Sequence, residues 1–518
     1  MPETSGRRTS DHLLSRGVSI DLEVGRNDGR IHCFAAVRCT AGESYTFSRG
    51  DLQSALKRLD QFVDGADYLL GHNLIEFDAI HLAAANPDLR LLKLPQVDTL
   101  RLNPLCFPRN PYHHLVKHYQ DGGLKRAQLN DPKLDAELTL GLLEDQYEAL
   151  RELQENDPSL LLALHWLTTV EKDSAGMEAL FSDVRQCPRP TSEATQSAIR
   201  KRFEGEICST HAEQLLSQLE ASPWPMAYAL SWLSVAGGNS VVSPWVRHAF
   251  PETMRIVQLL RDSACTDPTC QWCRTRHDAR VELERWFGFE DFRPEPADAN
   301  GHPLQQAIVE AAMAGQHVLG ILPTGAGKSL CYQIPALSRY DKTGSITVVI
   351  SPLVALMSDQ VAGLESKGIS SCAALNGLLS MPERSDVLDR VRLGDISVLI
   401  ISPEQLRSRA LRRVLEQREI GGWVLDEAHC LSKWGHDFRP DYRYVGRYIK
   451  ERAREAPIPP ILCLTATAKP DVVRDIVGYF RESLDVELTS YDGGSSRDNL
   501  DFFVLQTTPA EKFARVFQ

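Results

Sequence analysis

The sequence predicts an α/β protein in three parts: a mixed-sheet domain over residues 1–150, a helical connector over 151–285 and a parallel α/β lobe over 286–518. Strand patterns joined by a hairpin-type turn open the chain, and the middle third carries apolar residues at helical spacing. From Trp286 onward, short apolar runs alternate with helical segments, which is typical of a parallel sheet. The 518 residues are enough for about three ordinary domains.

The composition argues against a membrane-spanning or secreted protein. No apolar run reaches the ~18 residues of a membrane span, and the polar N-terminus has no signal-peptide core. We therefore expect a cytoplasmic protein whose 12 cysteines stay reduced and pair, if at all, around a metal. The formal net charge of −12 does not itself indicate nucleic-acid binding, so any DNA contact must use a local basic or aromatic surface.

The N-terminal third begins with the strand VSIDLEV over residues 18–24, followed by a turn at Asn27-Asp28-Gly29. The remaining predicted elements are a returning strand over 30–38, helices over 52–62, 77–85 and 131–150, and a strand over 68–73.

Four carboxylates stand at strand ends or on a helix of this domain: Asp21, Glu23, Asp78 and Asp135. Because side chains two apart on a strand share a face, Asp21 and Glu23 can hold one cation together. Acidic ligands suit Mg²⁺ or Mn²⁺, and two such ions support attack on a phosphodiester. A solvated acidic strand face is the plain alternative for the same pattern.

Three segments of this domain resemble the DEDD family of 3′–5′ exonucleases. SIDLEV is similar to the first motif of that family, GHNLIEFDAIHL (residues 71–82) to its second and NDPKLDAEL (residues 130–138) to its third. The resemblance implies a ribonuclease H-like fold and assigns the four carboxylates above to Mg²⁺ or Mn²⁺.

One position departs from the family pattern. The family places a His five residues before the last Asp, or a Tyr four before it, and here Asn130 and Asp131 stand there. Asn cannot take a proton from water near neutral pH. We expect metal ligands without rapid hydrolysis, leaving a module that binds or senses single strands. Nearby histidines are candidate replacement bases: His113, His114 and His118.

The connector contains a compact group of metal-binding residue types. Cys265-x4-Cys270-x2-Cys273-x3-His277 offers three thiols and an imidazole, which suits a structural tetrahedral Zn²⁺ site. Free thiols at a helix end are the plain alternative. An iron–sulfur cluster that also uses Cys208 or Cys187 is the competing metal hypothesis.

A phosphate-binding loop is the strongest signal of the last part. The apolar run 318–322 breaks into Pro-Thr-Gly-Ala-Gly and then enters a helix at Lys328 and Ser329. Such a loop turns backbone N–H groups and a helix N-terminus toward phosphate, so Lys328 can reach the β/γ-phosphates of ATP and Ser329 can ligate Mg²⁺. The loop residues predicted to bind the nucleotide are Thr324, Gly325 and Gly327.

Further strands are predicted over 346–351, 398–402, 423–425 and 461–465, and each ends in polar residues. Ser351 and Ser402 are predicted to face a nucleic-acid backbone. Asp426 and Glu427 of WVLDEAH are predicted to hold Mg²⁺ and to orient the attacking water, with His429 closing the catalytic set. Thr465 and Thr467 of LTATA lie at the neighbouring strand end and are predicted nucleotide-site residues.

These segments together resemble the RecQ family of DNA helicases. The resemblance rests on LPTGAGKSLCYQIPAL, SPLVALMSDQV, ISPEQL, DEAHCLSKWGHDFRPDY and LTATA. It implies a RecA-like lobe and an ATP-dependent DNA helicase of 3′–5′ polarity. It also implies that residues 430–442 form a loop that couples single-stranded DNA to ATP hydrolysis, in which aromatic rings stack on bases and cations bind phosphate. The residues concerned are Trp434, His436, Phe438 and Arg439, and Gln305 is the candidate adenine contact.

The resemblance ends near residue 500, where a second motor lobe is expected to begin. We therefore expect a truncated chain that binds ATP and DNA with negligible unwinding, since such motors hydrolyse ATP between two lobes. Two alternatives remain at this point. One is a 3′–5′ exonuclease with an accessory ATP-binding lobe, and the other is a DNA-binding protein that ATP switches without turnover.

Overall fold

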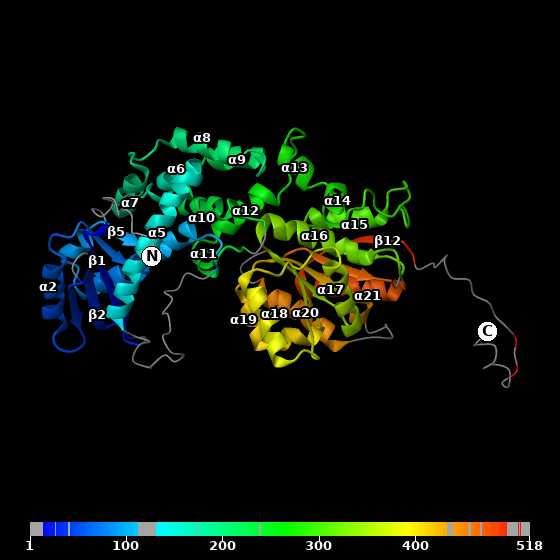
Figure 1. Ribbon diagram of the computed structural model, residues 1–518. Helices are drawn as coiled ribbons and strands as arrows, with labels where there is room; N and C mark the ends of the chain where they lie inside the picture. Colours follow the sequence, from blue (N-terminus) through cyan, green and yellow to red (C-terminus); the bar gives the residue numbers. More distant parts are fainter. Residues whose placement is uncertain are drawn as a thin grey trace, which may run out of the picture.

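The computed structural model describes residues 14–25, 27–39, 42–111, 131–171, 173–237, 240–432, 439–453, 457–466 and 469–494, with residues 506 and 508. Figure 1 shows a sheet domain at the N-terminal side, a group of helices in the middle and a second sheet domain after it. Across these ranges, every helix is too short or too polar to cross a membrane.

The N-terminal domain is built on a mixed five-stranded sheet in the order β3-β2-β1-β4-β5. Its central strand β1 pairs antiparallel with β2, where Ile20 lies opposite Ala36, and parallel with β4, where Val18 lies opposite Leu69. The strands are β1 (Gly17–Val24), β2 (Ile31–Arg38), β3 (Ser44–Phe47), β4 (Tyr68–Gly71) and β5 (Gln96–Asp98). The predicted hairpin is present, and the short edge strand β3 extends it.

Helices cover this sheet and lie close to the predicted positions. They are α2 (Leu52–Phe62), the π-helical turn η1 (Leu74–Asp78), α3 (Ala79–Ala85), the 3₁₀ turn η2 (Arg90–Lys93), α4 (Thr99–Cys106) and α5 (Pro132–Asn156). Helix α2 has the predicted bounds because Asp51 caps it, accepting from the Ser54 N–H at 2.9 Å, while Leu56 and Leu59 are buried. The predicted helix over 77–85 is divided between η1 and α3.

Helix α5 crosses the expected domain boundary at residue 150. Its first turns pack on β1 and β2, where Ser19 Oγ donates to the Ala136 carbonyl at 2.9 Å, and its later turns contact α6 and α7. Because 25 residues form one continuous helix, it belongs to both the sheet domain and the connector.

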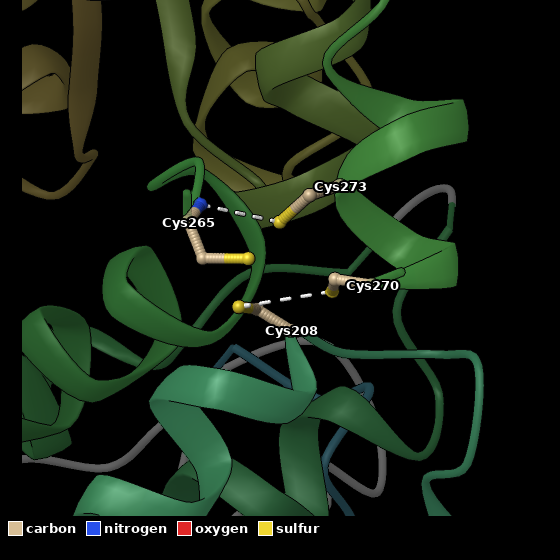
Figure 2. A group of neighbouring side chains, drawn as sticks. All are labelled: Cys208, Cys265, Cys270 and Cys273. Carbon is tan, nitrogen blue, oxygen red and sulfur yellow. Dashed lines mark hydrogen bonds between the residues drawn. The ribbon is translucent and has the colours of Figure 1, made fainter. Parts of the chain in front are cut away.

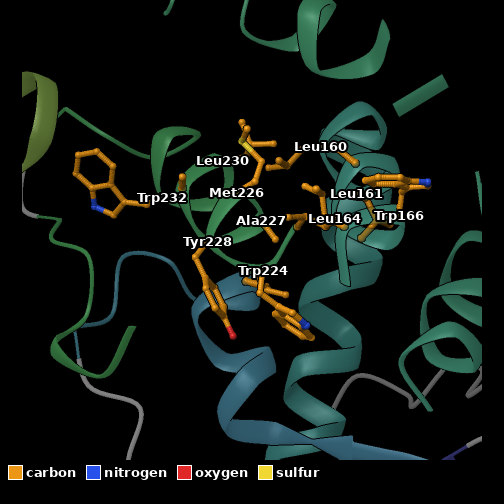
Figure 3. Packing of buried hydrophobic residues seen from close by; sticks show 14 of the residues in the cluster. Leu160, Leu161, Leu164, Trp166, Trp224, Met226, Ala227, Tyr228, Leu230 and Trp232 are labelled. Carbon is orange, nitrogen blue, oxygen red and sulfur yellow. The ribbon is translucent and has the colours of Figure 1, made fainter. Parts of the chain in front are cut away.

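The connector is helical, as its pattern predicts. Its helices are α6 (Pro158–Thr168), α7 (Ala175–Arg185), α8 (Ser192–Arg202), α9 (Ser209–Leu216), α10 (Pro223–Leu233), α11 (Pro244–Ala249), α12 (Glu252–Arg261) and α13 (Gln271–Arg276). Helix α10 lies almost wholly buried beside α6, and Figure 3 shows Met226 and Leu230 facing Leu160. The same apolar core includes Leu70 and Val97 of the N-terminal sheet, so sheet and connector share one core.

The second sheet is parallel throughout its seven strands, in the order β12-β6-β11-β10-β7-β9-β8. The strands are β6 (Val318–Ile321), β7 (Ile346–Ile350), β8 (Cys372–Leu375), β9 (Val398–Ile401), β10 (Ile420–Leu425), β11 (Ile461–Thr465) and β12 (Thr489–Asp492). The five predicted strands form its interior. The two that sequence reasoning missed, β8 and β12, lie at the edges.

Helices and short turns connect these strands: α14 (Ala279–Phe287), α15 (Leu304–Met313), α16 (Lys328–Thr343), α17 (Val354–Glu365), α18 (Met381–Leu393), η4 (Pro403–Arg407), α19 (Arg409–Glu416), η5 (Ala428–Leu431), α20 (Pro440–Arg452) and α21 (Pro470–Leu484). The expected boundary at residue 285 falls inside α14. Ala279, Leu283 and Phe287 of that helix belong to the core of the second sheet domain. We call this domain, from Ala279 onward, the motor lobe.

We expect Gly176→Ala to lower the free energy of unfolding by about 1–3 kcal/mol. A Cβ at Gly176, on α7, would overlap the Gln96 carbonyl at the start of β5, and backbone cannot yield as a side chain can. Gly141→Ala on α5 is the matched control, because nothing lies within 4 Å of a Cβ there, and it should stabilise by about 0.5–1 kcal/mol. Denaturant midpoints measure both changes, and equal midpoints would contradict the close approach of α7 to β5.

Candidate functional site

The phosphate loop follows β6 at the carboxyl edge of the parallel sheet. The Leu322 N–H still donates to the Thr465 carbonyl at 3.0 Å, and residues 323–327 then turn into α16. Gly325 and Gly327 adopt φ values of 89° and 80°, which favour glycine, and Gly327 caps the helix that begins at Lys328. The positive end of a 16-residue helix therefore faces the loop.

Two side chains from outside the loop hold it in shape. The Gln305 amide donates to the Gly327 carbonyl at 2.9 Å, and the Arg293 backbone N–H donates to Gln305 Oε1 at 3.3 Å. The Arg293 guanidinium donates to the Gly325 carbonyl. Gln305, predicted as an adenine contact, is 1% exposed, so its amide is engaged with the loop in this structure.

The acidic pair follows the wholly buried strand β10. The Asp426 N–H donates to the Ile350 carbonyl at 2.9 Å, which continues the sheet pairing to the carboxylate itself. Glu427 has a φ of 48° and donates its N–H to Asp426 Oδ1 at 3.0 Å. The Tyr442 hydroxyl donates to the Asp426 carbonyl at 2.8 Å, which fixes the turn from the other side.

Lys328 and the acidic pair lie within electrostatic reach of each other. Burial, together with the neighbouring Glu427 carboxylate, raises the pKa of Asp426 to about 6, while the Lys328 ammonium acts against that rise. A hydrogen bond with His429 lowers the pKa of Glu427, and Lys328 lowers it further. The structure therefore places the lysine near enough to the two carboxylates to act on the pKa of each. Lys328 Nζ donates to the Leu322 carbonyl at 3.4 Å.

His429 links the acidic pair to the adjacent strand β11. Its Nδ1 lies 3.2 Å from Glu427 Oε2 and 3.1 Å from the Thr465 hydroxyl. Hydrogen bonds with the Cys430 and Glu427 side chains raise the pKa of His429 to about 10, so it is a cation at neutral pH. Thr467, the other predicted threonine, lies outside the described residues.

The remaining predicted nucleotide residues lie at the mouth of the loop, where Thr324 is exposed and Ser329 half-buried. Sequence reasoning missed Gln360 on α17. Its side chain hydrogen-bonds with Asp426 and accepts from the Tyr332 hydroxyl, which connects α16 to the acidic pair. The signal that could have found Gln360 was its place inside SPLVALMSDQV.

The expectation for the two strand-end serines is wrong. Ser351 is fully buried and Ser402 is 3% exposed, so neither hydroxyl is presented to a nucleic-acid backbone. The reason is that the sheet pairing continues through both residues: the Ser351 N–H donates to the Ile401 carbonyl at 3.0 Å, and the Ser402 N–H donates to the Leu375 carbonyl at 3.4 Å. The Ser402 hydroxyl also donates to Glu404.

The coupling loop, residues 430–442, is described at its two ends, 430–432 and 439–442. Arg439 is exposed and donates to the Pro352 carbonyl at 2.9 Å, which joins this loop to the segment after β7. Trp434, His436 and Phe438, predicted to contact DNA, lie outside the described residues.

The N-terminal domain gathers three of its four predicted carboxylates. Asp21 and Glu23 on β1 and Asp135 in the first turn of α5 offer oxygens within 4.8 Å of one another. Asp78 lies beside this group and not in it. It accepts from the Leu22 N–H at 3.2 Å, and burial, with Asp21 and Asp98 nearby, holds its pKa well above the usual range. The candidate bases His113, His114 and His118 lie outside the described residues, in segment 112–130, as does Asn130 at the position of the family's base.

Asp98, for which no role was predicted, holds the turn that carries Asp78. Its carboxylate accepts from the N–H groups of Asn73 at 3.0 Å and Ile75 at 3.1 Å, just where η1 begins. The same carboxylate accepts from the Leu100 N–H at 3.0 Å and caps α4. One buried acid therefore fixes both ends of the segment between β4 and α4.

Four cysteines of the connector converge, and they correct the predicted zinc ligands. The Sγ atoms of Cys208, Cys265, Cys270 and Cys273 lie within 4.8 Å of one another, and Figure 2 shows them pointing to a common centre. The Sγ atoms of Cys208 and Cys270 are 4.0 Å apart, and the Cys265 N–H donates to Cys273 Sγ at 3.4 Å. Although burial opposes it, hydrogen bonds from Cys273 and Ser209 lower the pKa of Cys270 to about 6.

His277, the predicted fourth ligand, lies elsewhere. Its Nδ1 is 3.5 Å from Lys342 Nζ on α16, and burial with Lys342 nearby lowers its pKa to about 4. The helix α13 turns His277 away from the thiols, toward the motor lobe. The exposed Cys187 is not part of the described group.

Comparisons with known proteins agree on the motor lobe. The family model of DEAD/DEAH box helicases matches residues 302–476. The probable ATP-dependent DNA helicase RecS of Bacillus subtilis is 40% identical over 195 residues, covering 38% of this chain and 36% of that protein. ATP-dependent DNA helicase RecQ of the same organism is 40% identical over 237 residues, covering 46% and 37% respectively. This part of the chain is homologous to RecQ-family DEAD/DEAH box helicases.

The RecQ-like homology is confined to a part of each protein, because the chain spans little more than a third of the length of these two relatives. Among solved structures, Mycobacterium smegmatis helicase Lhr bound to ssDNA and AMP-PNP gives a TM-score of 0.32 at 21% identity, covering 40% of this chain and 27% of that one. A hypothetical ATP-dependent RNA helicase from Sulfolobus tokodaii gives 0.31 at 17%, covering 41% and 56%. Scores this low establish nothing beyond the sequence homology.

We expect Gln305→Ala to weaken binding of Mg·ATP about tenfold, because it leaves loop carbonyls without their donor and loosens the turn before Lys328. Gln306→Ala is the matched control, since Gln306 is also buried but its amide donates to Glu310 on its own helix at 2.7 Å. Fluorescent-nucleotide titration measures both. Equal affinities of the two variants would contradict the role given to Gln305.

Proposed function

We propose that the motor lobe is the ATP-binding lobe of a RecQ-type DNA helicase of 3′–5′ polarity, which couples ATP hydrolysis to DNA unwinding. The observation that carries this proposal is the electrostatic proximity of Lys328, on the phosphate loop, to Asp426 and Glu427 at the end of β10. Homology to proteins named ATP-dependent DNA helicases supports the choice of reaction.

Each residue then has a role that follows from its chemistry. The loop N–H groups, Thr324, Gly325, Gly327 and Lys328 would bind the phosphates, and Ser329 with Asp426 would hold Mg²⁺. Bound Mg²⁺ would offset charge on the phosphates. Glu427 would orient the attacking water, and its hydrogen bond to His429 keeps its carboxylate ionised for that task.

DNA is the proposed partner, and the coupling loop is its proposed contact. Trp434 and Phe438 would stack on bases, with His436 and Arg439 near phosphate. The bond of Arg439 to the Pro352 carbonyl supports a path from this loop to the carboxyl edge of β7, beside Asp426. His429 and Thr465 provide a second polar connection, from the acidic pair to β11. Thr467 is included in that connection as a proposal.

For the N-terminal domain we propose a DEDD exonuclease-like, ribonuclease H-like module that binds Mg²⁺ or Mn²⁺. The approach of Asp21, Glu23 and Asp135 to within 4.8 Å supports a metal site, and Asp78 would join it as the fourth acid. Asn130 stands where the family has its general base, so we propose slow or absent hydrolysis. The three gathered acids also favour the second candidate function, an active 3′–5′ exonuclease to which the motor lobe delivers DNA.

Zn²⁺ is the third proposed metal, held by the four convergent cysteines. Four thiolates fill a tetrahedral site and leave no position for water, so the role would be structural.

We expect Glu427→Ala to lower DNA-stimulated ATP hydrolysis at least about a hundredfold while leaving Mg·ATP affinity within about threefold, because Glu427 acts on water and not on the phosphates. Lys328→Ala should instead lower the affinity. Hydrolysis is measured on a protein that also carries a second motor lobe, and affinity on the 518-residue chain. Glu365→Ala, at an exposed site on α17, is the matched control. Unchanged turnover in Glu427→Ala would defeat the proposal.

The N-terminal domain has its own test. We expect the wild-type chain to bind Mn²⁺ and to degrade single-stranded DNA slowly or not at all, because Asn130 cannot act as a base. Asp21→Ala should lose Mn²⁺ binding, whereas Asp28→Ala, at an exposed turn beyond the same strand, should keep it. Titration of Mn²⁺ and a nuclease assay give both readouts. Rapid digestion that depends on Asp21 would favour the active exonuclease instead.

A further inference from the structure

The large apolar clusters of the described residues fall on two sides of residues 262–278, those of the N-terminal sheet and connector before them and those of the motor lobe after them. One core runs from the N-terminal sheet through the connector to Leu260 on α12. The core of the motor lobe begins at Ala279 on α14. Residues 262–278 link the two bodies and contribute to neither core, and we call this segment the joint.

The contact that the joint makes with the motor lobe is largely ionic. Asp262 lies 2.9 Å from Arg339 and 3.5 Å from Lys342, both on the last turns of α16. Arg276 pairs with Asp341 on the same helix, and Arg285 lies 3.1 Å from that carboxylate. Ion pairs of this kind set orientation but stabilise less than apolar burial.

Packing along the joint is open. A cavity of about 850 Å³ lies between the bodies, with Gln258 and His277 on one side and Arg339 and Ser345 on the other. Beside the cavity the connector touches the motor lobe through Trp232, which lies against Gly344, and through the Arg247–Glu419 ion pair. Neither contact involves the joint, so the order of the joint itself needs another source.

The four cysteines lie at this place. Cys265, Cys270 and Cys273 belong to the joint, whereas Cys208 belongs to the connector, where its N–H donates to the Leu260 carbonyl at 2.8 Å. The Trp272 indole, between two of the thiols in sequence, donates to the Arg261 carbonyl at 3.0 Å. The group therefore fastens the joint to the end of α12.

The distances suit one ion better than a cluster. Four thiolates at the Zn–S bond length form a tetrahedron with edges of about 3.8 Å, close to the 4.0 Å between Cys208 and Cys270. All four Sγ atoms lie within 4.8 Å, so small side-chain rotations complete the site. An iron–sulfur cluster holds its cysteines farther apart because several metal atoms lie between them.

We propose that Zn²⁺ at Cys208, Cys265, Cys270 and Cys273 is the clamp that holds the connector and its N-terminal sheet domain to the motor lobe. This inference rests on the proposed zinc site and adds its role. Zinc orders residues 262–278, which places Asp262 and Arg276 against the far end of α16. That helix is about 24 Å long and begins at Lys328, so the clamp sets where the N-terminal domain sits relative to the phosphate loop.

The test uses the full chain with and without zinc. We expect about one zinc per chain and no visible absorption in the wild type. Removal of zinc by a chelator should raise the rate of trypsin cleavage at Arg274 and Arg276 about tenfold, because the joint loses its order, and added zinc should restore resistance. Arg274 is exposed, so its protection in the zinc form must come from backbone order.

Substitutions distinguish zinc binding by the four cysteines from the role of zinc as a clamp. Cys208→Ser should lose zinc and become trypsin-sensitive at the joint, whereas His277→Ala and the exposed Cys187→Ser should retain zinc. A wild-type chain without zinc, or with iron and a brown colour, would overturn the zinc site itself. A zinc-bearing chain whose chelated form is cut no faster at Arg274 and Arg276 would overturn the clamp and leave the zinc site standing. Since chelation acts on folded wild-type protein, the test does not depend on whether Cys208→Ser folds.

Discussion

The parallel pairing of β6, β11 and β10 is the constraint on which the candidate ATP site depends. Strand β11 lies between the strand that ends in the phosphate loop and the strand that ends in the acidic pair. Backbone pairing extends past the strands, at Leu322 on one side and Asp426 on the other, so both carboxyl ends lie level. Thr465, at the end of β11, hydrogen-bonds with His429 at 3.1 Å and so links β11 to the acidic pair. The sheet therefore brings a cation and two carboxylates together although about 100 residues separate them in the chain.

The interior of the motor lobe could be predicted because its strands are short runs of apolar residues, each ending in a recognisable polar group. Strands β8 and β12 lie at the sheet edges, where one side lacks a partner strand, and their sequences carry no comparable signal. In the N-terminal domain, the α2 pattern and its Asp51 cap predict the helix bounds, since both are local features. The π-helical turn η1 depends on Asp98, a residue 20 or more positions away, so local pattern could not reveal it.

The same division between local and distant contacts explains which residues of the candidate ATP site and of the cysteine group could be predicted from the sequence. Lys328, Asp426 and Glu427 belong to contiguous motifs, and the sheet topology then fixes their meeting. Ser351 was misjudged because its polarity was visible and its continued pairing in the sheet was not. For the cysteines, spacing within residues 265–277 suggested His277 as the fourth ligand. Cys208 lies 62 positions before Cys270, and only the packing of α9 against α12 brings them together.

The two proposed metal-dependent modules are joined unequally to the connector between them. Helix α5 runs from the cluster of carboxylates in the N-terminal domain into the connector, and one apolar core spans both parts. Hydrophobic burial therefore stabilises the contact between the N-terminal domain and the connector. The contact with the motor lobe includes the ion pairs of Asp262 and Arg276, and that of Arg247 on α11 with Glu419, beside a cavity. Largely buried ion pairs give direction but little net free energy, because removing the charges from water offsets their attraction. The two sheet domains are therefore connected by more than one route, and residues 262–278 are the route that a metal ion at the four thiols would make rigid.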